Sequence, residues 1–275
     1  MEDRITMSDG ITLSVRRHEP EQTQATRTLL WCHGIGEHGG KHQHVIDEYV
    51  ARGWRVILPD LRGHGVSEGL RTDVKTFERY LLDFDRLVEH YEIQPLRTAL
   101  YGHSMGGLVM TRYVQTRHQP WAALVLSAPL LGVAVPIPHW KWWLGKFLAK
   151  VAPRTHLRTG IREDNLTRDP EFLRKRRADP LIQKSVTVRW FFTMLKTVQK
   201  AHRDAARIQL PVLIVQGMLD RTTDSAIPEQ WLARVSSTDK QFIGYPDGLH
   251  EMLNDTKWRT VLAAIMDWLD RRIPG

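Results

Sequence analysis

The sequence from Thr98 to about His118 places a serine on a tight turn between a strand and a helix. A short apolar segment at 98–101 precedes the run GHSMGG at 102–107, and apolar residues at helical spacing follow it. A serine on so sharp a turn has strained backbone, and its neighbours two positions away must lack bulk where helix and strand crowd together. The helix that follows points its N-terminal amides at the same place. The pattern therefore predicts that the Ser104 hydroxyl is raised above the sheet beside hydrogen-bond donors.

Strands and helices alternate along most of the chain. A predicted hairpin ends with the alternating segment 11–16, and buried strands are predicted at 28–32, 55–58, 98–101, 122–127, 212–215 and 241–245. Helices are predicted at 42–52, 74–91, 105–118, 228–235 and 256–272. This alternation is typical of an α/β fold with a mostly parallel central sheet and helices on both faces.

The alternation stops between residues 130 and 207, where the sequence is helical or irregular and shows no clear strand. A chain of 275 residues fits one α/β domain with an insertion better than two independent domains. We therefore expect 1–129 and 208–275 to form the core, and 130–207 to form an inserted helical cap.

The predicted cap carries all of the positive excess. The chain has 39 basic and 31 acidic residues, and 17 of the basic but only 6 of the acidic residues lie between 130 and 207. A segment with so large a positive charge can attract anionic surfaces or ligands. Alternatively, its basic side chains simply cover a solvated helical surface. Because no nucleic-acid-binding module is recognisable, we expect no nucleic-acid partner.

An apolar and aromatic set lies near the start of the cap. Its members are Trp140, Trp142, Trp143, Leu144, Phe147 and Leu148. Their spacing suits an amphipathic helix with lysines nearby, which either lies at an anionic membrane surface or packs on the core. Trp140, Trp143 and Phe147 are the cap residues that we expect to contact the substrate or to line the cap.

The chain has one cysteine, Cys32, so no intramolecular disulfide forms. No apolar signal segment occurs near the first residues, and the uncharged stretch 121–140 is broken by prolines and by Gly132. These features predict a cytoplasmic protein without a transmembrane segment, with peripheral membrane contact through the cap as an option.

A serine hydroxyl needs a base to take its proton, and the base needs an acid to orient it. Among the histidines downstream of Ser104, His250 alone lies in a loop after a predicted core strand and before the final helix. Gly248 allows the turn that aims the ring back at the edge of the sheet. We therefore expect His250 to be the base.

Asp220 is the best candidate for the acid, because it follows the predicted strand at 212–215 and so lies at the edge where open α/β sheets bind ligands. Asp224 is its main rival. Asp247 is too close to His250 in sequence to approach its Nδ1 comfortably.

Hydrolysis of an ester also requires donors for the developing oxyanion. The backbone N–H of Met105 supplies one at the turn. The glycine-rich loop at 33–40 is expected to supply the second through the amide of Ile35. A third cluster, at 60–69, contains Asp60 and Arg62, whose pairing would hold that loop in place; we assign these two residues a structural role and not a catalytic one.

Taken together, these motifs resemble the monoacylglycerol lipase and lysophospholipase group of α/β-hydrolases. The resemblance rests on HGIGEH at 33–38, DLRGHGVSEG at 60–69, GHSMGG at 102–107, GMLD at 217–220 and YPDGLHE at 245–251. It implies a serine hydrolase with the triad Ser104, Asp220 and His250, with oxyanion donors at Ile35 and Met105 and with a mobile cap. The arginine load of the cap departs from the family.

Three functions follow from these residues. The first is hydrolysis of acyl esters of single-chain lipids, of monoacylglycerol or lysophospholipid type, through an acyl-serine intermediate. The alternative is an esterase, C–C hydrolase or perhydrolase that uses the same triad on a small non-lipid substrate. A non-catalytic binding module is a third option. No metal-ligand spacing or dinucleotide fingerprint occurs, so we expect neither a metal nor a cofactor.

Overall fold

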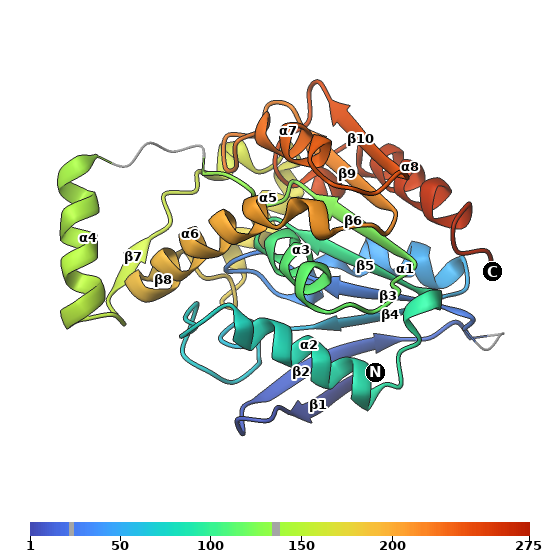
Figure 1. Cartoon of the computed structure of the whole chain (residues 1–275), viewed down its shortest axis with the longest axis horizontal. Coiled ribbons are helices and arrows are strands. Elements are labelled where there is room, and N and C mark those ends of the chain that lie inside the picture. The colour runs from blue at the N-terminus through green and yellow to red at the C-terminus, as the bar shows by residue number, and fades with distance from the viewer. Residues whose placement is uncertain (22–24, 134–137) are drawn as a thin grey trace.

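The computed structural model describes residues 1–21, 25–133 and 138–275 and contains an eight-stranded sheet (Figure 1). In spatial order the strands are β1 (Glu2–Thr6), β2 (Thr12–His18), β4 (Trp54–Pro59), β3 (Arg27–Cys32), β5 (Thr98–His103), β6 (Ala123–Ser127), β9 (Val212–Gly217) and β10 (Lys240–Tyr245). Strand β2 is antiparallel to both of its neighbours, and the strands from β4 to β10 are parallel. This arrangement is the predicted α/β-hydrolase fold.

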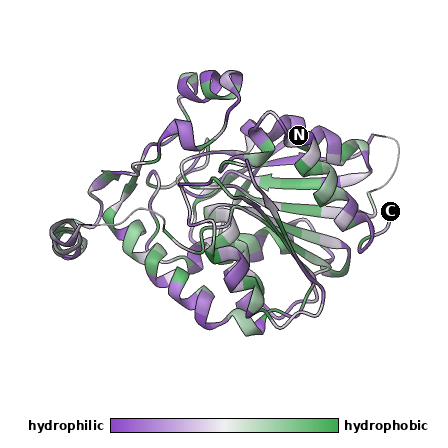
Figure 2. Ribbon diagram, turned by 90° about the horizontal axis from the view of Figure 1, so that it is seen from above, coloured by the Kyte–Doolittle hydropathy of each residue, from purple (hydrophilic) through white to green (hydrophobic). Residues whose placement is uncertain are grey.

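Helices cover both faces of the sheet, so its central strands are apolar on both sides. On one face lie α1 (Gln43–Ala51) and α8 (Trp258–Asp270); on the other lie α2 (Glu78–His90), α3 (Met105–Thr116), α6 (Val188–Arg203) and α7 (Ile227–Ala233). Each face of the sheet forms a hydrophobic cluster with its helices, and successive residues of β3 alternate between the two clusters. Leu29 and Trp31 pack on the face with α1 and α8, and Leu30 and Cys32 pack on the opposite face. Figure 2 shows the apolar strands in green between the helices.

The carboxyl ends of the central strands meet at one edge of the sheet. Cys32 is paired with Gly102, His103 with Ser127, Ser127 with Val215, and Gly217 with Tyr245. The segments after β3, β5, β9 and β10 therefore start side by side. These segments carry the residues that the sequence analysis selected: the loop at 33–40, Ser104, Asp220 and His250.

The chain leaves the sheet after β6 and returns to it at β9, although β6 and β9 are direct neighbours. Between them lie α4 (His139–Val151), β7 (His156–Arg158), α5 (Pro170–Ala178), β8 (Ser185–Thr187) and α6. Helix α6 buries Trp190 and Met194 in the core cluster that includes α3. The boundaries of the cap, 130 and 207, stay a prediction, and residues 134–137 of it lie outside the described residues.

The expectation that this segment contains no strand was wrong. Strands β7 and β8 form a separate two-stranded antiparallel sheet, in which His156 is paired with Thr187. Each strand has three residues, and all three of β7 are exposed, so neither gives an apolar alternation in the sequence. The paired residues also lie about thirty positions apart in the sequence, so no short hairpin turn between the strands predicts their pairing.

Helix α4 stands apart from the body of the molecule (Figure 1). It packs against α6, where the rings of Trp142 and Phe192 lie 5.3 Å apart. No helix among the described residues has both the length and the apolar character needed to cross a membrane.

Candidate active site

Ser104 lies between the end of β5 and the start of α3 in backbone that few residues other than glycine adopt. Its φ is 51° and its ψ is −117°. The flanking glycines are required by contact: a Cβ on Gly102 would lie 2.5 Å from the carbonyl oxygen of Gly106, and one on Gly106 would lie 2.1 Å from that of Cys32. The close packing of β3, β5 and α3 therefore holds the serine on its turn, as the motif predicts.

Asp220 and His250 are hydrogen-bonded to each other, with 2.7 Å between Oδ2 of the carboxylate and Nδ1 of the ring. The carboxylate also accepts hydrogen bonds from the amide of Thr222 and from the amide and hydroxyl of Thr223. Only 6% of Asp220 and 3% of His250 is exposed. The structure thus brings together the acid and the base that the sequence analysis selected.

The pair stabilises the charged form of each partner. Burial raises the pKa of Asp220, but the charge and hydrogen bond of His250 outweigh it and the pKa is lowered overall. Burial lowers the pKa of His250, and the charge and hydrogen bond of Asp220 reverse that shift, so the pKa is raised above 6.5. An imidazolium that forms during a reaction would therefore be stabilised here.

The rival acids have other partners. Asp224 accepts a hydrogen bond from the amide of Ala226, just before α7. Asp247 forms an exposed ion pair with Lys257. Among the described residues, neither carboxylate contacts the ring of His250.

His250 lies beside the turn that carries the serine. Its ring centre is 4.9 Å from that of His103, the residue before Ser104. Within the described part of the chain, Ser104 Oγ and His250 form no hydrogen bond. Such bonds are often long in the absence of substrate and shorten in the reacting complex.

The two backbone amides predicted as oxyanion donors, those of Ile35 and Met105, belong to segments that adjoin Ser104. Met105 is the first residue of α3, where the amides lack partners within the helix. Ile35 lies in the loop after β3, and a Cβ on its neighbour Gly34 would come within 3.3 Å of Ser104 Cβ. Neither amide donates to a backbone group in the described turns and loops.

Ser104 opens into a cavity of about 330 Å³. Its apolar residues include Ile35, Leu130, Val186, Trp190, Phe191 and Met194. Its polar residues are Thr159, Arg162, Asn165, Arg221, Thr222 and Thr223. A concave, mostly apolar site with a few polar groups is typical of a small-molecule or lipid site.

The sequence matches one family model over residues 23–257, and its description is "Serine aminopeptidase, S33". The chain belongs to this family. It is a serine hydrolase of the α/β-hydrolase fold.

Known relatives of this S33 family member include two bacterial enzymes. It is 28% identical to phospholipase YtpA of Bacillus subtilis, over 89% of this chain and 95% of that protein. It is 29% identical to the monoacylglycerol lipase of Mycolicibacterium smegmatis, over 90% of this chain and 89% of that one. Among solved structures, the monoacylglycerol lipase of Paleococcus ferrophilus is 27% identical, with a TM-score of 0.85 over 94% of this chain and 99% of that chain.

A buried charge cluster, which the sequence analysis missed, adjoins the predicted triad of this family member. Lys41 forms ion pairs with Glu37 and with Glu251, the residue after His250. Glu251 also lies 3.6 Å from Nε2 of His103. The cluster therefore connects the loop after β3 with the residues adjacent to both Ser104 and His250. Within this cluster, only the ion pair of Glu37 and Lys41 could have been predicted from the sequence, because these residues lie four positions apart.

Glu37, His103 and Glu251 offer three ligand atoms within 4.8 Å of one another, which is the spacing of a metal site. The ammonium of Lys41, however, binds both carboxylates and supplies the positive charge itself. Burial lowers the pKa of Lys41 to about 8 and that of His103 to about 4. Burial raises the pKa of Glu251, but Lys41 and His103 outweigh it and hold the pKa well below 4.5.

The three aromatic residues predicted for the cap do not line the cavity at Ser104. Trp140, Trp143 and Phe147 are 64%, 67% and 61% exposed on α4. Helix α4 is therefore not packed on the core through these side chains. Their role in substrate or membrane contact stays a prediction.

The expected pairing of Asp60 with Arg62 was wrong. Asp60 binds Arg16 at 2.7 Å, and Arg62 binds Asp83 at 2.5 Å and Asp9 at 2.8 Å. Asp60 also accepts hydrogen bonds from the amides of Gly39 and Val66, so its carboxylate is satisfied without Arg62. The loop at 60–69 is therefore held by Arg16 of β2 at Asp60, and by Asp83 of α2 and Asp9 at Arg62.

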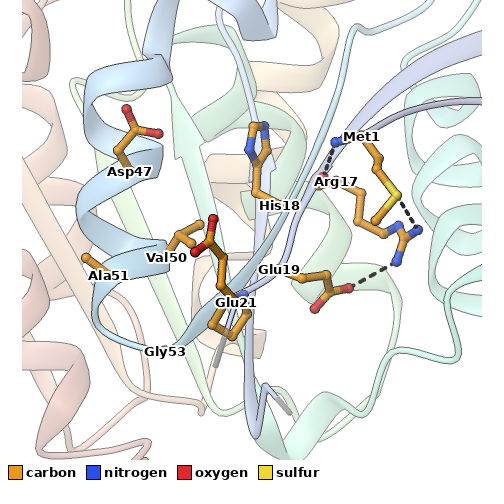
Figure 3. Close-up of a pocket in the computed structure, with 10 residues that line it drawn as sticks. Met1, Arg17, His18, Glu19, Glu21, Asp47, Val50, Ala51 and Gly53 are labelled. Atoms are coloured by element: carbon orange, nitrogen blue, oxygen red, sulfur yellow. Dashed lines mark hydrogen bonds and ion pairs between the residues drawn. The ribbon is translucent and has the colours of Figure 1, made fainter. Parts of the chain in front are cut away.

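A larger hollow, of about 780 Å³, lies by the N-terminus and is shown in Figure 3. Some of its charged groups have partners: Arg17 binds Glu19 at 3.2 Å, and the amine of Met1 donates to the carbonyl of Arg17. It shares no residue with the cavity at Ser104. The smaller cavity is therefore the candidate active site.

Proposed function

We propose that this protein hydrolyses carboxylic esters of single-chain acyl lipids, of monoacylglycerol or lysophospholipid type, through an acyl-serine intermediate at Ser104. The observation that carries the proposal is the hydrogen-bonded pair of Asp220 and His250 beside a strained serine, at a cavity with a large apolar wall.

In the proposed reaction, His250 Nε2 takes the proton of Ser104 while Oγ attacks the ester carbonyl carbon. The negative oxygen that forms accepts hydrogen bonds from the amides of Ile35 and Met105. As the intermediate collapses, the acyl C–O bond breaks and the imidazolium gives its proton to the leaving alcohol. Water then repeats these steps on the acyl-serine and releases the fatty acid. Asp220 holds the ring and stabilises its charged form throughout.

The apolar wall of the cavity supports a lipid acyl chain as the substrate group. Val186, Trp190, Phe191 and Met194 come from β8 and α6 and lie on the same cavity as the serine. The relatives named above act, by their names, on monoacylglycerol or phospholipid. No residue of the proposed reaction requires a metal or a cofactor.

We also propose that α4 lies on anionic membranes, which would bring the cavity to its lipid substrates. Trp143, Phe147 and Val151 are more than half exposed, and Lys146 and Lys150 lie on the same helix. Exposed aromatic and apolar side chains with nearby lysines are typical of interfacial helices. We propose further that the protein is located in the cytoplasm and that residues 130–207 form the cap.

The test is hydrolysis of an ester series by the wild type and by Ser104→Ala. We expect the wild type to prefer long-chain monoacylglycerol or lysophospholipid over short-chain aryl esters, and to react with a fluorophosphonate probe. Ser104→Ala should lose at least about a thousandfold in kcat and all labelling, because no other group supplies the nucleophile. Ser225→Ala, which removes the hydroxyl of a serine that does not line the cavity, is the matched control.

Three outcomes are informative. Wild-type turnover in Ser104→Ala would contradict the mechanism. A preference for short aryl esters would support the small-substrate alternative. Absence of labelling in the wild type would favour a binding module.

A further inference from the structure

The cavity at Ser104 has positive residues and no negative ones in its described lining. Arg162 and Arg221 are the two charged residues there, and no aspartate or glutamate belongs to it. Positive charge without opposing carboxylates attracts an anionic ligand. A neutral ester of glycerol offers no negative group to this charge.

Neither guanidinium is held firmly by the protein. Arg221 is exposed and forms no ion pair with any residue in the described ranges. Arg162 has one partner, Asp164, at 3.4 Å, and these side chains are 76% and 73% exposed. An exposed pair at this distance contributes little and is easily exchanged for a ligand.

Both arginines lie beside the predicted triad. Arg221 directly follows Asp220. Arg162 precedes the short 3-10 turn Glu163–Asn165, and the carbonyl of Asn165 accepts a hydrogen bond of 3.4 Å from the amide of His250. The apolar lining comes instead from β8 and α6. The cavity thus has cations on the segments next to the triad and an apolar wall on separate elements.

Resting on the proposed ester hydrolysis, we propose that Arg162 and Arg221 form a subsite for a phosphate group on the leaving alcohol. The acyl chain lies along α6, the ester carbonyl lies at Ser104, and the phosphate lies at the guanidiniums. Guanidinium groups bind phosphate oxygens with paired, charge-assisted hydrogen bonds. The preferred substrates are then lysophospholipids, which water converts to a fatty acid and a glycerophosphate without any further reactant.

The experiment compares two substrates that differ only in the phosphate. Lysophosphatidic acid and monoacylglycerol with the same short acyl chain are used below the concentration at which they form micelles, so that membrane attraction of the cap does not contribute. The quantity measured is the ratio of kcat/KM for the phosphate ester to that for the neutral ester. We expect a ratio of about ten or more in the wild type, arising mainly from a lower KM.

The variants are Arg162→Gln, Arg221→Gln and the control Arg158→Gln. Arg158 is exposed on β7, lies four positions before Arg162, has no ion pair with a described residue and does not line the cavity. Each pocket variant should lower the ratio about tenfold, whereas the control should keep it. Arg221→Lys should retain part of it, because the charge remains while the paired geometry is lost.

The ratio separates this proposal from damage to the triad, which would slow both substrates and leave their ratio unchanged. A ratio that stays within about twofold in both pocket variants would overturn the phosphate subsite. If the wild type hydrolyses monoacylglycerol well but shows no preference for phosphate, the subsite fails and the proposed function stands. If it hydrolyses neither these esters nor their long-chain counterparts, the proposed function itself fails.

Glycerol 3-phosphate gives a second measurement that needs no lipid. It should inhibit hydrolysis of a short aryl ester competitively in the wild type, and about tenfold more weakly in Arg221→Gln. Added salt should weaken inhibition, because exposed charges are screened. Equal inhibition of the wild type and Arg221→Gln would count against the subsite.

Discussion

The edge of the sheet and the segment at 130–207 differ in how they hold charge. At the edge, ionic side chains are buried and paired: Asp220 with His250, and Lys41 with Glu37 and Glu251. In the segment, basic residues outnumber acidic ones by 17 to 6. Arg162 and Lys146, for example, are exposed there. The first arrangement fixes geometry, and the second leaves charge available to ligands and surfaces.

This difference predicts how each region responds to mutation. Removal of one buried partner leaves an uncompensated charge and disturbs positions around it. Removal of an exposed charge leaves the fold intact and alters what the protein binds. Changes at the edge of the sheet should therefore affect catalysis and stability, and changes in the segment should affect recognition.

The largest effect is expected at the acid. Asp220→Asn should lower kcat about a thousandfold or more, because an amide favours the wrong tautomer of His250 and no longer stabilises the imidazolium. Asp224→Asn, which changes the rival acid, should stay close to the wild type. Both are measured as kcat on one ester, with urea unfolding as a check of the fold. Comparable losses in the two variants would remove the distinction between the acids.

The next effect concerns stability. Lys41→Met should lower the free energy of unfolding by about 3–5 kcal/mol, because Glu37 and Glu251 lose the cation that compensates their buried charges. The measurement is urea denaturation at neutral pH. Lys257→Met, at an exposed ion pair, is the matched control and should unfold like the wild type. A wild-type midpoint for Lys41→Met would show that the buried cluster does not stabilise the fold.

The positions of Ser104, Asp220 and His250 at one edge of the sheet could be predicted because local rules determine them. The glycines around Ser104 are required by contacts within a few residues, and strands buried on both faces must be apolar throughout. The positions of Asp220 and His250 follow from chain order, since residues after parallel strands collect at one edge.

Other features depend on partners that are distant in the sequence and could not be predicted. Glu251 and Lys41 are separated by 210 positions. Asp60 pairs with Arg16 rather than with Arg62, because the fold brings β2 beside β4. The pairing of β7 with β8 and the exposure of α4 likewise depend on how the segment at 130–207 folds back on the core.

A smaller effect is expected in the pH dependence of kcat/KM. Only neutral His250 can accept the serine proton, and Asp220 holds the pKa of the ring above 6.5. The rate of the free enzyme should therefore rise with pH through this raised pKa. Asp220→Asn removes the negative charge while burial remains, so the rising limb of its residual activity should move to lower pH. A limb that stays in place would indicate that another group controls it.

The smallest effect on the rate of hydrolysis is expected for substitutions on α4, because these should alter binding to membranes and not the reaction itself. In the wild type, we expect binding to phosphatidylglycerol vesicles and much weaker binding to phosphatidylcholine vesicles, measured by sedimentation. The double variant Trp143→Ser, Phe147→Ser should bind anionic vesicles about tenfold more weakly, because two exposed aromatic side chains no longer enter the interface. Leu96→Ser removes an apolar side chain that is 70% exposed outside this helix and should bind like the wild type. Equal binding by all three proteins would show that α4 is not the membrane-facing surface, and the contrast between the two regions would then rest on Arg162 and Arg221 alone.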